Sequence, residues 1–148
     1  MKIALKQARR AFEDGEVPIG AVLSDQWGKI LSKAKNQMIN RCDPTAHAEI
    51  LAMREAACRT NNYRLLNTTL YVTVEPCIMC MAAIIHARVS KVVFGAYDPK
   101  WGGGGSLYNF AKDLRLNHHP EIINGVCDEE SKRLLKDFFR LKRNKKKE

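Results

Sequence analysis

The sequence contains no apolar run that approaches the roughly 20 residues of a transmembrane helix, and no signal peptide is visible. Cysteine is scarce: two of the five form one Cys-x-x-Cys pair, and Cys42, Cys58 and Cys127 outline no disulfide framework. Acidic residues are few, 16 against 25 Lys and Arg. These absences argue against a membrane protein and against a disulfide-rich secreted domain. We therefore expect one cytoplasmic domain over residues 1–148, without a membrane partner.

Positive charge gathers near the carboxyl end. Residues 131–148 hold nine Lys and Arg against two acidic residues, which accounts for +7 of the net +9. Phe138 and Phe139 stand there beside Arg140, and aromatic faces next to guanidinium groups suit unstacked bases and phosphates. The segment from about 128 to 148 therefore predicts a basic helix and tail that contact RNA. A solvated helix end is the alternative.

Two short segments, 45–49 and 75–80, carry the groups that indicate chemistry. They supply one imidazole, two thiols and one carboxylate, from His47, Cys77, Cys80 and Glu49. Imidazole and thiolate ligands suit Zn²⁺, and three protein ligands leave a coordination position for water. The pKa of such a water falls from about 15.7 towards about 7 in favourable zinc sites. The segments predict a hydrolytic site with one Zn²⁺ per subunit, in which Glu49 carries protons.

The spacing of these residues predicts that two helix N-termini meet at the metal. Cys77 and Cys80 are three apart and face one way on a helix, and Pro76 suits the first helical position. Thiols at a helix N-terminus lose their protons more readily than free thiols. His47 and Glu49 are two apart, so their side chains converge only across the end of a helix.

Three features allow more than one interpretation. A structural zinc needs a fourth ligand, for which Cys42 is the nearest spare thiol, and it leaves Glu49 without a role. A thioredoxin-like redox pair is disfavoured, because no strand leads into the pair in the way expected of that motif, with Trp-flanked cysteines. The glycine run at 102–105 lacks the Gly-Lys-Ser/Thr ending of a P-loop, so it is either a flexible surface turn or a mobile wall of a substrate cleft.

Hydrophobic periodicity and turn residues predict alternating helices and strands. We expect helices at about 2–14, 45–58, 76–88 and 128–143, and strands at 19–24, 29–35, 69–74, 91–96 and 122–124. The first two strands read as a hairpin. Strand–helix alternation after a hairpin implies an α/β sandwich with a mixed sheet and helices on both sides.

The sequence resembles the cytidine-deaminase superfamily and, within it, the bacterial tRNA-specific adenosine deaminases. The matching pieces span nearly the whole chain, at 16–22, 36, 43–49, 62–65, 76–80, 94–96, 98–100, 105–107 and 138–140. The resemblance implies a three-layer α/β/α sandwich with a mixed five-stranded sheet and Zn²⁺ as cofactor. It also implies hydrolytic deamination of adenosine to inosine at the wobble position of a tRNA anticodon loop. The family works as homodimers in which both subunits line each site.

The resemblance further assigns substrate contacts outside the tail to Asn36, Ala48, Asp98, Lys100, Asn117 and His118. An amide such as that of Asn36 can read an adenine edge bidentately, and a turn at a strand end is its alternative role. Asp98 and Lys100 suit a ribose hydroxyl and a phosphate, or are idle surface charges. Trp27 and Trp101 depart from the family pattern and receive no role.

Two rival functions stay open. One is a deaminase of free bases or nucleotides with the same zinc chemistry, but a small substrate gains nothing from a charge of +7 at one terminus. The other is a non-catalytic RNA-binding or structural zinc subunit. Relatives of that kind typically lack the glutamate, which is present here as Glu49.

Overall fold

The structure is a computed structural model that describes residues 1–145, so the last residues of the predicted basic tail, 146–148, lie outside the described residues. The helices are α1 (Lys2–Glu13), α2 (Met38–Arg41), α3 (Ala48–Thr60), α4 (Ile78–His86), the 3₁₀ helix η1 (Phe110–Lys112) and α5 (Asp128–Lys145). The strands are β1 (Gly20–Ser24), β2 (Ile30–Lys35), β3 (Thr69–Val74), β4 (Lys91–Ala96) and β5 (Glu121–Ile123). Each predicted helix and strand is present, whereas α2 and η1 were not predicted.

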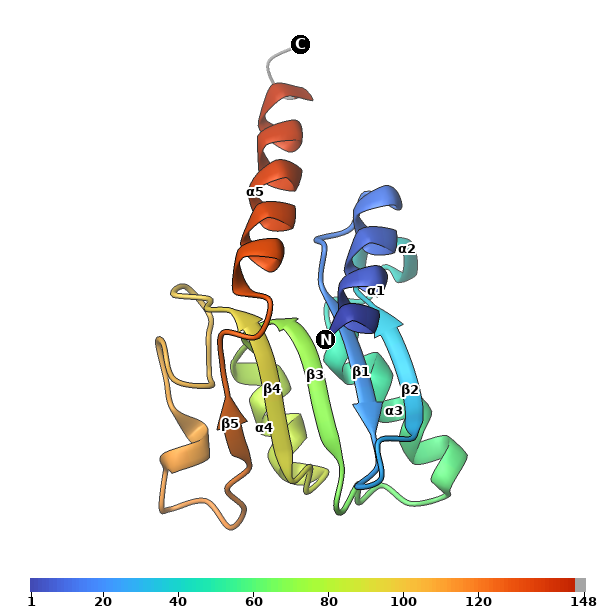
Figure 1. The fold of residues 1–148 in the computed structure, drawn as a ribbon, viewed down its shortest axis with the longest axis vertical. Coiled ribbons are helices and arrows are strands. Elements are labelled where there is room, and N and C mark those ends of the chain that lie inside the picture. The colour runs from blue at the N-terminus through green and yellow to red at the C-terminus, as the bar shows by residue number, and fades with distance from the viewer. Residues whose placement is uncertain (146–148) are drawn as a thin grey trace.

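The strands form one five-stranded sheet in the order β2-β1-β3-β4-β5 (Figure 1). β1 runs antiparallel to β2 and β3, while β4 runs parallel to β3 and β5. The mixed sheet predicted from the sequence is therefore confirmed. All five residues of β1 are buried, as expected for a strand with helices packed on both faces.

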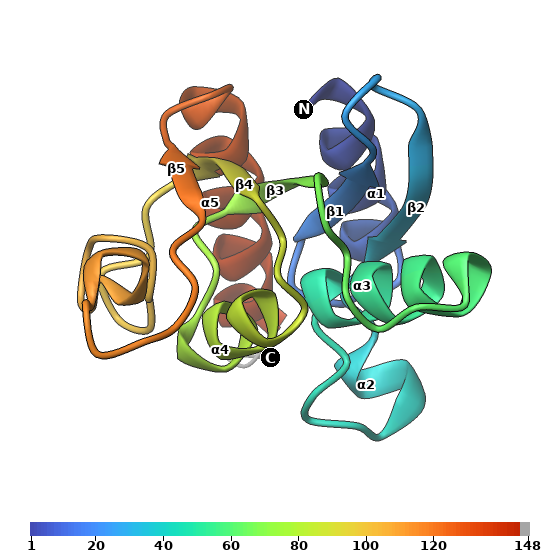
Figure 2. The same cartoon turned by 90° about the horizontal axis from the view of Figure 1, so that it is seen from below.

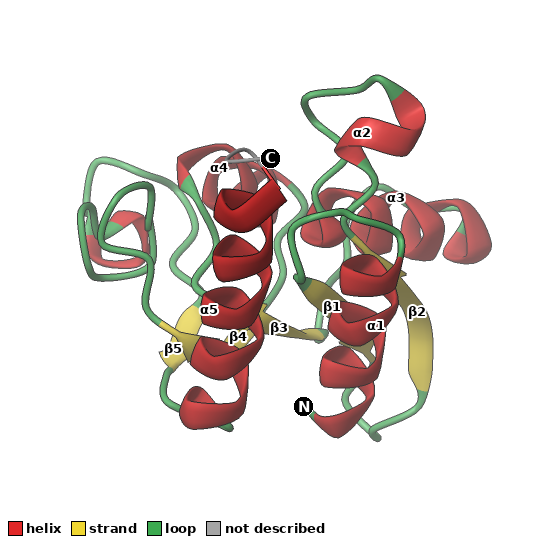
Figure 3. Cartoon of the chain, turned by 90° about the horizontal axis from the view of Figure 1, so that it is seen from above, coloured by secondary structure: helices red, strands yellow, loops and turns green. Residues whose placement is uncertain are grey.

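Helices cover both faces of the sheet. α1 and α5 lie side by side on one face, and α3 and α4 lie on the other (Figures 2 and 3). α1 turns its apolar stripe, including Leu5 and Ala8, towards the sheet. The rings of Phe12 and Phe138 meet edge to face at 5.7 Å and join α1 to α5. This is the predicted three-layer sandwich. No helix in the described part of the chain is both long enough and apolar enough to cross a membrane.

The start of α4 differs from the prediction. Pro76 was expected at the first helical position, but the helix begins at Ile78 and Cys77 is its N-cap, in extended conformation with φ −70° and ψ 174°. The physical reason is a neighbouring chain segment. The Pro76 carbonyl accepts a hydrogen bond from Gly103 at 2.8 Å, and Cys77 forms an isolated bridge with Gly102. These contacts hold the segment before α4 extended.

Candidate active site

The N-termini of α3 and α4 bring three potential metal ligands together. His47 is the N-cap of α3, Cys77 is the N-cap of α4, and Cys80 lies in the first turn of α4. His47 Nδ1 lies 3.6 Å from Cys77 Sγ and 3.5 Å from Cys80 Sγ. All three ligand atoms lie within 4.8 Å of one another. The predicted meeting of two helix N-termini is therefore present.

These separations fit tetrahedral zinc. Bond lengths of about 2.3 Å to sulfur and about 2.05 Å to nitrogen, at a tetrahedral angle, place the two ligand atoms about 3.6 Å apart. The observed nitrogen–sulfur distances, 3.5 and 3.6 Å, agree with that value. The described residues offer the metal one His and two Cys here, and Cys42 is exposed and outside the cluster, so it does not supply a fourth ligand. The donor set leaves a position open, as catalytic zinc sites do.

The hydrogen bonds within the cluster favour the thiolate form of Cys77. Hydrogen bonds from Cys80 and then His47 lower the pKa of the Cys77 thiol to about 4. The hydrogen bond donated to Cys77, together with burial, raises the pKa of Cys80. The hydrogen bond to Cys77 raises the pKa of His47 above its usual value. The protein itself thus stabilises the thiolate of Cys77.

Glu49 lies in the first turn of α3, two residues after His47. Its side chain is 2% exposed, and its Oε2 has no hydrogen-bond partner among the described residues. Burial raises the pKa of this carboxyl group to about 7. A buried carboxyl with an orphan oxygen is costly unless a ligand uses it, so the site is arranged for a partner that the protein itself does not supply.

The cluster lies in a cavity of about 550 Å³. Ile19, Val74 and Ile78 give it apolar walls, and its polar groups include His47 and Glu49. Both the volume and the apolar lining with few polar groups are usual for sites that bind small molecules or single bases. An aromatic base can therefore be shielded from water directly beside Glu49.

Known proteins resemble this chain in both sequence and fold. The family described as "Cytidine and deoxycytidylate deaminase zinc-binding region" matches residues 1–96. The tRNA-specific adenosine deaminases of Haemophilus influenzae and Bacillus subtilis are each 48% identical over 147 residues, 99% of this chain and 85% and 91% of theirs. A solved structure from a study of A-to-I editing by tRNA:A34 deaminases at the wobble position of transfer RNA has a TM-score of 0.88 and 41% identity. It covers 91% of this chain and 97% of that one.

The chain belongs to the cytidine and deoxycytidylate deaminase family. Among its members it is similar, along nearly its whole length, to the tRNA-specific adenosine deaminases, so the resemblance seen in the sequence is confirmed. Zn²⁺ is the cofactor of this family, and the His47, Cys77 and Cys80 cluster is able to hold it.

A loop over the N-terminus of α4 closes one side of this deaminase cavity, and Glu75 organises it. The buried carboxylate accepts hydrogen bonds from the amides of Asp98, Gly104 and Ser106 and from the Ser106 hydroxyl. Gly102 packs directly on it, where any Cβ would collide with the carboxylate. Residues 102–104 are buried. Gly102 and Gly104 therefore pack against Glu75, a residue that lines the cavity, so a flexible surface turn describes only the exposed Gly105.

Asn36 and Ala48 are joined by a hydrogen bond. The Asn36 amide oxygen accepts the Ala48 N–H at 2.8 Å, and both residues are almost completely buried. The Ala48 N–H is therefore already bound within the protein and is not free for the substrate contact that the resemblance assigns to Ala48. Asn36 instead caps the first free amide of α3 and so fixes the start of the helix that carries His47 and Glu49.

Asp98 lines the cavity, whereas Lys100 is exposed nearby. The Asp98 carboxylate accepts the amides of Lys100 at 3.0 Å and Trp101 at 3.3 Å. It therefore shapes the turn at the rim of the cavity. Trp101 also lines the cavity, although the sequence pattern pointed to no role for it.

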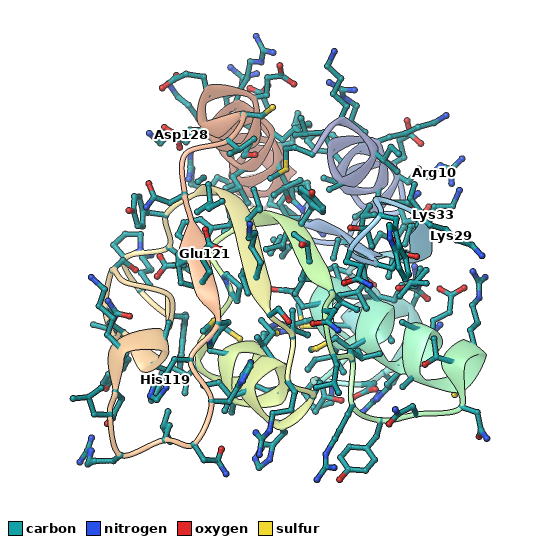
Figure 4. All side chains as sticks on the ribbon, turned by 60° about the horizontal axis from the view of Figure 1, so that its bottom comes forward. Arg10, Lys29, Lys33, His119, Glu121 and Asp128 are labelled. Carbon is teal, nitrogen blue, oxygen red and sulfur yellow. The ribbon has the colours of Figure 1, made fainter. Side chains whose placement is uncertain are left out.

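The structure does not bring Asn117 and His118 to the cluster. His118 Nε2 donates to the Val89 carbonyl at 2.7 Å, next to the amino end of β4, whereas the cluster lies beyond the carboxyl end of β3. Figure 4 shows their neighbours His119 and Glu121 on the β5 side of the molecule. Any contact of Asn117 and His118 with RNA lies outside the cavity.

The aromatic residues of α5 have different environments. Phe138 is buried and packs edge to face against Phe12 and Phe139, and it also lines a groove on α5, so its contact with RNA stays a prediction. Phe139 is 46% exposed. Arg140 is exposed and pairs with Asp137 at 3.0 Å.

Proposed function

We propose that this deaminase converts adenosine to inosine at the wobble position of a tRNA anticodon loop. The observation that carries the proposal is Glu49, buried with an orphan oxygen, beside the His47–Cys77–Cys80 cluster in a cavity large enough for a purine. The similarity to tRNA-specific adenosine deaminases over 147 residues supports the choice of substrate. An unpaired loop base also costs less to extrude than a base in a duplex.

The proposed roles follow from the positions of the side chains. His47, Cys77 and Cys80 hold Zn²⁺, which supplies a Lewis acid that makes a water molecule more acidic. Glu49 takes a proton from the attacking water and delivers it to N1 of the ring as the oxygen adds to C6. It then moves the proton of the new C6 hydroxyl to the amino group, the C6–N bond breaks as the C6 carbonyl forms, and ammonia and inosine are released. Ile19, Val74 and Ile78 exclude other water from the base.

The RNA outside the cavity is proposed to follow the C-terminal half of α5. A groove of about 360 Å³ lies there, and its lining includes Val17, Ile39, Phe139, Lys142 and Arg143. Residue 17 lines this groove and residue 19 lines the catalytic cavity, so only a short segment separates the two. The groove offers one exposed aromatic ring and two cations, which suit a base and its phosphates. Arg140 lies outside the groove and reaches RNA only by leaving Asp137.

The resemblance to deaminases that work as homodimers extends the proposal to a homodimer of this chain. Sedimentation at several protein concentrations tests it, and a monomer at working concentration rejects it. We place the reaction in the cytoplasm, because free cysteines such as Cys42, Cys58 and Cys127 are usual in a reducing compartment.

The proposed function is tested by incubating the zinc-loaded protein with an anticodon stem-loop that carries a wobble adenosine. Inosine in that loop, with little product from free adenosine, cytidine or guanine, is the expected result. A stem-loop with adenosine moved one position away is the matched control substrate. Faster turnover of a free base than of the stem-loop contradicts the assignment and favours the small-substrate deaminase.

A further inference from the structure

Trp101 is an exposed tryptophan at the rim of the catalytic cavity. Its residue is 64% exposed and yet lines the same cavity as His47 and Glu49. Exposed apolar residues scattered singly are ordinary, but this indole belongs to the lining of the cavity that holds Glu49, within reach of a chain that places a base there. The neighbouring Lys100 is exposed and carries positive charge at the same rim.

The backbone of Trp101 is held in place. Its carbonyl accepts the first amide of α4, from Ile78, at 3.1 Å, and its own amide donates to the Asp98 carboxylate at 3.3 Å. The next residue, Gly102, packs on the Glu75 carboxylate and bridges to Cys77. The backbone that carries the indole is thus fixed to the helix with the cysteine pair, so no backbone ordering is needed when a ligand stacks on the indole.

Extruding the target adenosine leaves its neighbour in the loop without a stacking partner. Because stacking on an aromatic side chain accepts any base, an indole at the rim replaces that partner without adding sequence selectivity. We propose that Trp101 is the stacking platform for the unpaired base adjacent to the target adenosine. The inference rests on the proposed function and adds a substrate subsite to it.

The test measures binding of the anticodon stem-loop in a Glu49→Ala background, where turnover does not consume the RNA. Trp101→Ala is expected to weaken binding by roughly 5- to 100-fold, the usual range for loss of one aromatic stack. Trp101→Phe should recover most of this loss, because a phenyl ring also stacks. Trp27→Ala is the matched control: Trp27 is 82% exposed on the turn between β1 and β2, and its removal should change binding less than twofold.

Stem-loops with an abasic site directly 5′ or 3′ of the target identify the stacked base. At one of these positions the abasic site should weaken binding to the protein that retains Trp101 as much as Trp101→Ala does, and should not weaken Trp101→Ala further. If the loss of affinity caused by Trp101→Ala and the loss caused by the abasic site simply add, at the 5′ and at the 3′ position alike, the inference is overturned. So does equal binding by Trp101→Ala and Trp27→Ala, or a Trp101→Ala defect confined to self-association in sedimentation, which makes the indole a contact between copies of the chain.

Fluorescence gives a readout independent of affinity. The chain has two tryptophans, so in Trp27→Phe the tryptophan fluorescence comes from Trp101 alone. Saturating stem-loop should quench it, and the abasic loop at the stacked position should quench it much less. Unquenched emission with bound RNA overturns the inference while the proposed function stands. If the wild-type protein forms no inosine from the stem-loop, the proposed function itself fails, and the subsite falls with it.

Discussion

The metal cluster and the C-terminal half of α5 differ in burial, charge and the way their side chains are held. Cys80 and Glu49 are almost completely buried, and the amides around them are bound to Asn36, Glu75 and neighbouring carbonyls. On α5, Phe139 and Arg140 are exposed, and the cations there are held by single ion pairs or by none that the structure records. The proposed chemistry lies where the geometry is fixed and water is excluded, whereas the proposed RNA contacts of α5 come from long, solvated side chains. Changes at the first region should therefore act on turnover, and changes at the second on affinity.

The largest expected effect is at a metal ligand. Cys80→Ser should lose zinc and deaminase activity together, because the remaining His47 and Cys77 cannot hold the ion tightly. Elemental analysis and inosine formation measure the two losses. Cys58→Ser, at an exposed thiol on α3 far from the cluster, is the control and should keep both. Activity of Cys80→Ser without bound metal contradicts the assignment.

The next effect separates proton transfer from metal binding. Glu49→Ala should retain zinc and fold but lose activity by about 10²- to 10⁴-fold, the usual contribution of a general acid–base group. Glu55→Ala, on the same helix and paired with Arg59, should behave like the wild type. Single-turnover rates with stem-loop RNA make the comparison. If Glu49→Ala keeps more than about a tenth of the rate, another group carries the protons.

A third prediction concerns the loop beside the cluster. Glu75→Gln should destabilise the protein by about 1–3 kcal/mol, because an amide in place of the carboxylate leaves buried N–H donors unpaired. Turnover should fall roughly tenfold to hundredfold, since the cavity wall that carries Asp98 and Trp101 is no longer held. Zinc content should not change. Thermal unfolding and single-turnover kinetics test both parts, and a variant as stable and active as wild type shows that Glu75 does not organise the loop.

The residues around the metal cluster could be predicted from the sequence only in part. The His-x-Glu and Cys-x-x-Cys spacings predicted the cluster, because each spacing has few structural solutions that bring its residues to a helix N-terminus. The role of Glu75 was missed, although a lone carboxylate directly after the apolar strand 69–74 was a usable signal. Ala48 was misassigned because its hydrogen-bond partner, Asn36, lies 12 residues away and a tertiary contact decides its availability.

The fold was predictable to within a few residues at most ends, because helical and strand periodicity are local. The start of α4 was not, since contacts with the distant residues 102 and 103 hold Pro76 and Cys77 extended. On α5, Phe138 and Phe139 are adjacent in sequence and lie on different faces of the helix. Helical periodicity puts Phe138 on the apolar face of α5, and its packing against Phe12 of α1 buries it while Phe139 stays exposed.

The smallest expected effect is on α5. Lys142→Gln with Arg143→Gln should weaken stem-loop binding. Each phosphate contact to a single strand contributes roughly 0.7 to the slope of log affinity against log salt, so the loss of two contacts should lower that slope by about 1.4. Saturating turnover should hardly change. Lys29→Gln with Lys33→Gln removes the same charge near β2, on the opposite side of the molecule from His119 (Figure 4), and is the control. An unchanged salt slope would make this half of α5 a solvated helix end.

The central claim is that one Zn²⁺, held by His47, Cys77 and Cys80, allows Glu49 to deaminate a wobble adenosine. Titrating metal-free protein with Zn²⁺ while counting inosine in the stem-loop tests it most directly. Deaminase activity is expected to rise linearly from near zero and to reach its plateau at one zinc per chain. Full activity before zinc is added, or a plateau at two zinc ions per chain, contradicts it.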